Sequence, residues 1–63
     1  MTLRDLLNKN IVESETEVSL SYDGCIVEFN NLWELEAEAI NGDFIDEEVK
    51  GYKNTKYGLI INM

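Results

Sequence analysis

The segment from Thr16 to Phe29 constrains the fold more than any other part of this sequence. Between Thr16 and Tyr22, apolar and polar residues alternate, which is the pattern of a half-buried β-strand. The dipeptide Asp23-Gly24 follows at once and suits a two-residue type I′ turn, in which both residues need a positive φ. Such a turn fixes the strand pairing and puts six residues on one face: Val18, Leu20 and Tyr22 opposite Phe29, Val27 and Cys25. The alternation and the turn therefore predict the same hairpin independently.

Cys25 shares this predicted inner face with Tyr22. We expect it to be a small buried residue, and no basic side chain lies near it in the sequence to activate its thiol. Ile26 is the one apolar residue that the register assigns to the opposite face. The hairpin is thus expected to have one apolar face and one mainly polar face.

A short helix is expected near the start of the chain. Thr2 followed by Asp5 indicates a capping box, in which the hydroxyl and the carboxylate accept hydrogen bonds from free N–H groups. We expect this helix to end between Asn8 and Asn10. It is too short to be stable alone, so its apolar stripe must dock on the rest of the domain. The stripe consists of Leu3, Leu6 and Leu7.

A second helix is expected from Leu32 to Ile40, capped by Asn31 with Glu34 and ended by Asn41-Gly42. It has two apolar strips with Glu36 between them, so we expect only one strip to pack on the hairpin. The other is expected to stay exposed or to meet a second chain, and we expect it to be the oligomer interface. The first strip comprises Leu32, Leu35 and Ala39, and the second comprises Trp33, Ala37 and Ile40. For Trp33 a core position and an interface position remain open alternatives.

The C-terminal part reads as two strands, 49–52 and 57–62, around a loop at 53–56. The register is ambiguous, because a three-residue loop places Val49 opposite Ile61 and a two-residue loop places it opposite Ile60. The element order α-β-β-α-β-β predicts a single small acidic α+β domain over residues 1–63. We expect a small antiparallel sheet with helices packed on one face.

Several function classes are excluded by composition. The chain has no His and one Cys, so imidazole-based catalysis, an internal disulfide and a thiolate zinc site are ruled out. We expect no catalytic residue, no metal site and no cofactor, and hence a protein that is not an enzyme. No apolar run approaches the roughly 18 residues of a membrane span, and a lone thiol suits a reducing cytoplasm.

The charge is unevenly distributed along the chain. Residues 10–49 hold 12 acidic residues and no Lys or Arg, whereas residues 50–63 hold three Lys and no acid. Such an acidic span repels phosphate, so we expect no direct nucleic-acid binding. It would suit a basic surface of a protein that itself binds nucleic acid. The alternative is that the charge serves only solubility. The expected partner contacts are Glu13, Glu15, Glu17, Glu28, Glu34 and Glu38.

The chain begins with Thr2-Leu3-Arg4-Asp5-Leu6-Leu7 and closes with Val49 followed by Leu59-Ile60-Ile61. Both ends resemble those of short acidic proteins from bacterial viruses and mobile elements. Some small acidic viral proteins of this kind are anti-CRISPR or other anti-defence inhibitors. These bind a host nuclease complex, sometimes as nucleic-acid mimics and often as homodimers. The resemblance implies such a role here, and it carries over no functional residue because no functional motif is shared.

Overall fold

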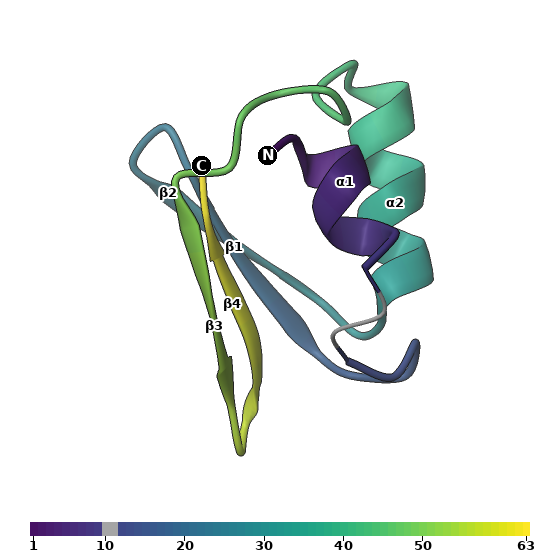
Figure 1. Cartoon of the computed structure of the whole chain (residues 1–63), viewed down its shortest axis with the longest axis vertical. Coiled ribbons are helices and arrows are strands. Elements are labelled where there is room, and N and C mark those ends of the chain that lie inside the picture. Colours follow the sequence, from purple (N-terminus) through teal and green to yellow (C-terminus); the bar gives the residue numbers. More distant parts are fainter. Residues whose placement is uncertain (10–11) are drawn as a thin grey trace.

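The computed structural model describes residues 1–9 and 12–63. In chain order these form α1 (Leu3–Leu7), β1 (Val18–Tyr22), β2 (Cys25–Phe29), α2 (Leu32–Asn41), β3 (Gly51–Thr55) and β4 (Gly58–Asn62). The α+β class and the predicted order α-β-β-α-β-β are confirmed. Both helices lie on the same side of the sheet, so the opposite side is left uncovered (Figure 1).

The four strands form one sheet in the order β2-β1-β4-β3. The two hairpins are antiparallel, but β1 and β4 pair in parallel, with Val18 opposite Leu59 and Leu20 opposite Ile61. The sheet is therefore mixed and not wholly antiparallel as predicted. The parallel pair arises because the connection through α2 carries the chain back along the sheet before β3 begins, and such a crossover is what parallel neighbours require.

The first hairpin has the predicted register, from Val18 opposite Phe29 to Tyr22 opposite Cys25. Asp23 and Gly24 both have a positive φ, as the tight turn requires. The burial of its second strand was predicted wrongly, because Cys25 is exposed and Val27 is 45% exposed. β2 is an edge strand, and the helices leave most of its inner face uncovered.

The second hairpin has a register that neither sequence alternative gave. Gly51 lies opposite Asn62 and Thr55 opposite Gly58, so the turn falls at residues 56–57 and Val49 lies before the strand. The Thr55 hydroxyl donates to the Gly58 carbonyl oxygen at 2.8 Å and accepts from the Tyr57 N–H at 3.1 Å. This local bonding stabilises a turn over Thr55–Gly58, which explains why the strand extends three residues beyond its predicted end.

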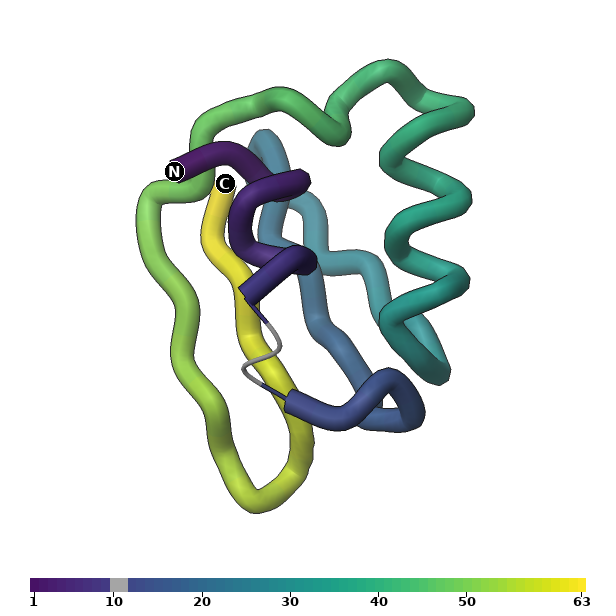
Figure 2. The backbone as a smooth tube through the Cα atoms, turned by 45° about the vertical axis from the view of Figure 1, so that its right-hand side comes forward, coloured from purple at the N-terminus to yellow at the C-terminus, as the bar shows by residue number. Residues whose placement is uncertain are grey.

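The first helix has the predicted capping box and its C-cap at Asn8, while Asn10 lies outside the described residues. Its first free N–H groups are bonded by the connector 43–50: the Leu3 N–H donates to the Glu47 carbonyl and the Arg4 N–H to the Ile45 carbonyl. In Figures 1 and 2 the N- and C-terminal ends lie close together. The connector thus ties α1 to the start of β3.

The core fills the space between the helices and the inner face of the sheet. The inner strip of α2, with Leu35 and Ala39 fully buried and Leu32 half-buried, packs there as predicted. The same face of the sheet contributes residues from β1 and β4. The buried set is Leu3, Leu6, Val18, Leu20, Leu35, Ala39, Ile45, Leu59 and Ile61.

Candidate protein-binding surfaces

The six glutamates expected to contact a partner do not form one continuous surface. Glu17 and Glu28 lie together on the uncovered face of the sheet, where Glu28 pairs with Ser19 across the hairpin. Glu34 and Glu38 lie on α2, on the other side of the sheet. The remaining two, Glu13 and Glu15, stand in the turn before β1. The structure therefore separates the set into a sheet group and a helix group.

The turn at residues 13–16 corrects one expectation. Glu13, Glu15 and Glu17 were expected to line one face of an extended segment, but the Thr16 N–H donates to the Glu13 carbonyl and closes a turn. The Ser14 carbonyl in turn accepts a hydrogen bond from the Leu32 N–H, at the start of α2. The turn is thus docked at the N-terminal end of this helix, where carboxylates are electrostatically favourable.

The outward strip of α2 is exposed, which removes a core position for Trp33. Its side chain is 68% exposed and that of Ile40 is 54% exposed, while Ala37 lies exposed between them. Helical spacing at 100° per residue places Glu34 and Glu38 along one side of this strip. We call Trp33, Glu34, Ala37, Glu38 and Ile40 the α2 surface. It combines apolar side chains with a carboxylate border.

The N-terminus of α2 explains part of this arrangement. The Asn31 side chain accepts from the Glu34 N–H at 2.9 Å, as its capping role requires. The Glu34 carboxylate accepts from the Asn30 N–H at 2.8 Å, one residue earlier than a standard capping box. Glu34 is therefore held in place by the helix start, whereas no described group pairs with Glu38.

Most of the acidic side chains that the structure describes are free of ion pairs. The two ion pairs of the described residues join Arg4 Nε to Asp46 Oδ1 at 2.8 Å and the terminal ammonium to Glu48 at 2.9 Å. The hydrogen bond and charge of Arg4 lower the pKa of Asp46, and the same contact raises the pKa of Arg4. Hydrogen bonds from the Thr2 backbone N–H and hydroxyl lower the pKa of Asp5. These contacts stabilise the N-terminal helix and leave the α2 surface unneutralised.

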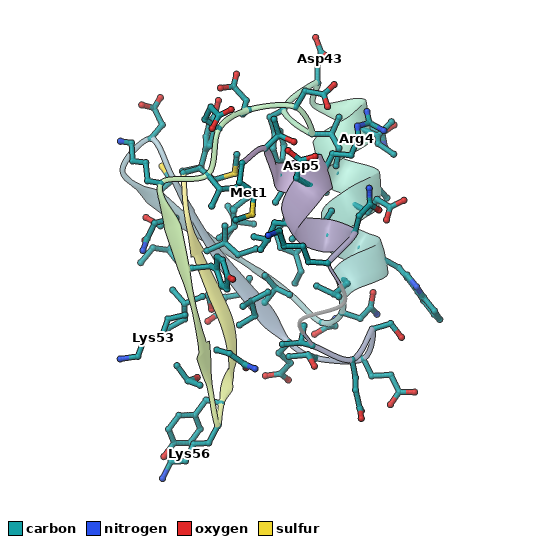
Figure 3. All side chains as sticks on the ribbon, in the orientation of Figure 1. Met1, Arg4, Asp5, Asp43, Lys53 and Lys56 are labelled. Atoms are coloured by element: carbon teal, nitrogen blue, oxygen red, sulfur yellow. The ribbon has the colours of Figure 1, made fainter. Side chains whose placement is uncertain are left out.

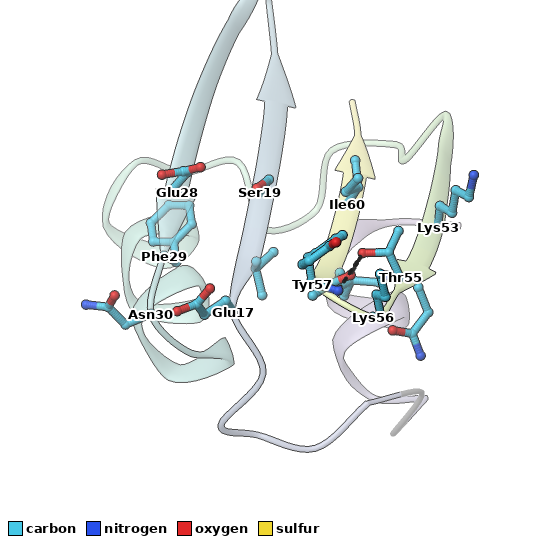
Figure 4. Close-up of a pocket in the computed structure, with 14 residues that line it drawn as sticks. Glu17, Ser19, Glu28, Phe29, Asn30, Lys53, Thr55, Lys56, Tyr57 and Ile60 are labelled. Atoms are coloured by element: carbon cyan, nitrogen blue, oxygen red, sulfur yellow. Dashed lines mark hydrogen bonds between the residues drawn. The ribbon is translucent and has the colours of Figure 1, made fainter.

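The uncovered face of the sheet contains a shallow groove of about 670 Å³. One cross-strand row runs across it, through the pairs Glu28–Ser19, Ser19–Ile60 and Ile60–Lys53. In Figure 4 these four side chains stand in a line across the face, with both helices behind the sheet. The row has a carboxylate at the β2 edge, an ammonium group at the β3 edge and small or apolar side chains between them.

A second row lies beside the first on the same face. It consists of Ile26, Ser21, Asn62 and Gly51. Ile26 projects to solvent with 74% of its surface exposed, and a Cβ built on Gly51 would meet no atom within 4 Å. The face therefore has a protruding apolar side chain at one edge and an open site at the other. The sequence analysis assigned no role to Ile60 or Gly51, although alternation along β4 places Ile60 on the face opposite the core residues.

The β3–β4 hairpin differs in charge from the other described elements. Figure 3 shows Lys53 and Lys56 along the β3–β4 hairpin, at the opposite end of the long axis from Asp43. Residues 50–63 contain no acid, so this hairpin is the one basic element among the described residues.

Comparisons with protein-family models, with curated proteins and with solved structures find no match to this chain. Within residues 1–9 and 12–63, no group of three or more His, Cys, Asp or Glu side chains is arranged to hold a metal ion. No helix in the same described part is both long and apolar enough to cross a membrane. The geometry to interpret therefore consists of two surfaces, the α2 surface and the uncovered sheet face.

Proposed function

We propose that this protein is a non-enzymatic binding protein that blocks a basic, nucleic-acid-binding surface of a host protein. The partner is a nucleic-acid-handling or defence complex in the host cytoplasm, and the protein acts as an anti-defence inhibitor of the kind its two ends resemble. The observation that carries the proposal is the α2 surface, where exposed Trp33 and Ile40 lie beside carboxylates that have no ion-pair partner among the described residues.

The chemistry of the α2 surface favours a cationic protein as its partner. A large exposed aromatic residue such as Trp33 is a usual anchor of a protein interface. The bordering carboxylates would attract Lys and Arg side chains and would repel phosphate. Glu13 and Glu15 extend the same negative region, since their turn is bonded to the start of α2. A basic groove that normally holds a polyanion meets these requirements.

The proposal is tested with the immobilised full chain and a bacterial lysate, with retained proteins identified by mass spectrometry. Basic nucleic-acid-binding proteins should be enriched and should elute with about 0.5 M salt, because screening at that ionic strength is nearly complete beyond a few ångströms. A triple variant with Glu13, Glu15 and Glu38 changed to Lys should lose them. Glu34 is left unchanged because it bonds the backbone at the helix start.

The matched control reverses one charge at a distance from α2. Glu38→Lys should weaken retention, whereas Glu47→Lys, on the exposed connector after α2, should leave it unchanged. Added duplex DNA should compete for the same basic partners. Retention that is equal for the wild-type and triple-variant proteins, or tight binding of DNA by the protein itself, would contradict the proposal.

A second candidate function is a homo-oligomeric accessory protein of a phage or mobile element, in which the charge only maintains solubility. The exposed strip of Trp33, Ala37 and Ile40 favours it, because an apolar strip of this kind also suits a second copy. Light scattering would then report a stable oligomer, such as a homodimer, that Trp33→Ala converts to a monomer. An unchanged mass in Trp33→Ala would refute this candidate.

A further inference from the structure

We infer that the uncovered face of the sheet is a dimerisation surface, and that its occupant is the same face of a second copy of this chain. The inference concerns the sheet and not the α2 surface, and it does not depend on the proposed host partner. It rests on the order of side chains in two cross-strand rows, which is complementary to itself under a two-fold rotation.

The charged row defines the direction of the two-fold axis. Across the face its order is Glu28, Ser19, Ile60 and Lys53, from the β2 edge to the β3 edge. Consider two copies packed face to face, with the two-fold axis midway between the sheets, parallel to the strands and level with the gap between β1 and β4. This axis places β2 of one copy over β3 of the other. Glu28 then faces the partner's Lys53 twice, and Ile60 faces the partner's Ser19 twice. An axis perpendicular to the strands would place like edges together, so opposite charges favour the first arrangement.

The second row fits the same axis by shape. Under that rotation Ile26 of one copy lies over the partner's Gly51, so that an exposed side chain meets a position with open space. No contact among residues 1–9 and 12–63 explains a glycine at position 51, because its φ is not positive and an added Cβ would meet none of their atoms within 4 Å. Gly51 is the first residue of β3, and a strand position with room for a side chain normally favours a larger, β-branched or aromatic residue. A glycine at position 51 is explained if it leaves space for the Ile26 side chain of a second copy.

The size of the face sets the expected strength. Four strands about 4.8 Å apart and five residues long at about 3.3 Å per residue give a projected patch of roughly 300 Å². Stable interfaces bury about 800 Å² per partner, so the dimer should be weak and should dissociate in the micromolar range or above. The two sheets would pack with their strands about 30° apart, and both pairs of helices would lie on the outside. The α2 surface of each copy would stay accessible.

Self-association through α2 is less well matched by charge. That helix carries Glu34, Glu36 and Glu38 and no basic residue, so two copies packed along it would bring six carboxylates together. The sheet face instead offers the Glu28 carboxylate of each copy an ammonium group, that of Lys53. Variants that reverse one charge can therefore distinguish a dimer formed through the sheet face from one formed through α2.

The test measures the dimer dissociation constant by sedimentation equilibrium up to about 1 mM protein in 0.15 M salt, where charges are screened beyond about 8 Å. Glu28→Lys and Lys53→Glu should each raise the dissociation constant about tenfold or more, because each turns two attractive pairs into two repulsive ones. An equimolar mixture of the two variants should form a heterodimer with both pairs restored. This recovery on mixing is specific to a two-fold arrangement.

Matched controls reverse the same charges on the helix side. Glu38→Lys and Lys9→Glu change the net charge equally but should leave the dissociation constant within about twofold of the wild-type value, since both lie outside the sheet face. Gly51→Val should weaken the dimer about tenfold by filling the site of Ile26, while the monomer remains folded by circular dichroism. A wild-type protein that stays monomeric at 1 mM would overturn the inference. So would a dimer whose dissociation constant is the same in Glu28→Lys as in its control, or one that mixing fails to restore.

Discussion

Two alanines on the same helix provide the sharpest test of the fold. Ala39 is fully buried and Ala37 is exposed two residues earlier, so Ala→Leu at the two positions adds the same atoms to opposite sides of α2. The change in helix propensity is equal at both sites and cancels in the comparison. The difference in the free energy of unfolding therefore reports packing alone.

The magnitude follows from the surroundings of Ala39. Its carbonyl accepts from the Phe44 N–H at 2.9 Å and from the Ile45 N–H at 3.1 Å, so the backbone here is fixed from two directions. A side chain with three more carbons cannot be accommodated by a simple shift of the helix, and overpacking costs about 1–3 kcal/mol. A domain of 63 residues has roughly 3–9 kcal/mol of total stability. At the middle of both ranges, Ala39→Leu should thus remove about a third of it.

Urea titration followed by circular dichroism measures this difference. With a slope of about 1 kcal/mol per M, Ala39→Leu should lower the midpoint by about 1–3 M, whereas Ala37→Leu should stay within about 0.5 M of the wild-type value. The fluorescence of Trp33 gives a second probe of the same transition. Equal midpoints for the two variants, or a larger loss in Ala37→Leu, would refute the assigned orientation of α2 and with it the α2 surface.

Three further predictions concern single contacts. Gly58→Ala should destabilise the protein by at least about 2 kcal/mol in urea titration, because Gly58 has φ +135° and a Cβ would lie 2.5 Å from the Glu17 carbonyl oxygen; an unchanged midpoint would contradict this close approach. Asn31→Ala should cost about 1 kcal/mol through loss of the helix cap, and Asn31→Asp should restore most of it in thermal unfolding. Arg4 lowers the pKa of Asp46 below its usual 3.8, so this pair stabilises the fold above about pH 4 and the contribution is lost as the pH falls through the lowered value. The gap in unfolding free energy between wild-type and Asp46→Asn proteins should therefore be present at pH 7 and should close as the pH falls below 3.8 and through the lowered pKa of Asp46. A gap independent of pH would contradict the assignment.

The parts of the fold that local chemistry determines could be predicted from the sequence. Asp23-Gly24 admits one tight turn, and that turn alone fixed the register of the first hairpin. The capping box at Thr2 and Asp5 and the buried strip of α2 likewise follow from short-range spacing. Each of these depends on residues within a few positions of one another, where propensity and hydrogen bonding act without help from the rest of the chain.

The errors arose where distant segments decide the outcome. The parallel pairing of β1 with β4 joins residues about forty positions apart, and no local pattern specifies it. The alternation around Cys25 gave the correct face, but burial depends on where a helix lies above that face, and both helices leave the β2 edge largely open. In the second hairpin a usable signal was present: Thr55 and Gly58 occupy the first and last positions of a β-turn, which is where a hydroxyl residue and a glycine are favoured.

The candidate surfaces show the same division. That α2 has a second apolar strip could be predicted from helical spacing, and its exposure followed once the first strip was buried. The charged row on the sheet could not be predicted from the sequence. Glu28 and Lys53 become members of one row only because β1 pairs with β4. The linear sequence has one acidic span, whereas the fold divides its six candidate contact glutamates between the sheet face and the helix side.

The order of strands converts the charge pattern of the sequence into a pattern in space. β2 comes from the span without basic residues and β3 from the span without acids, and the sheet order places these two strands at opposite edges. Had β3 paired beside β2, Glu28 and Lys53 would neutralise each other within one chain. Because β1 and β4 lie between them, Glu28 and Lys53 are about 14 Å apart, which is three strand spacings. Each charge is therefore free to pair with the opposite charge on another molecule. The same topology that the sequence could not specify therefore creates the self-complementary face.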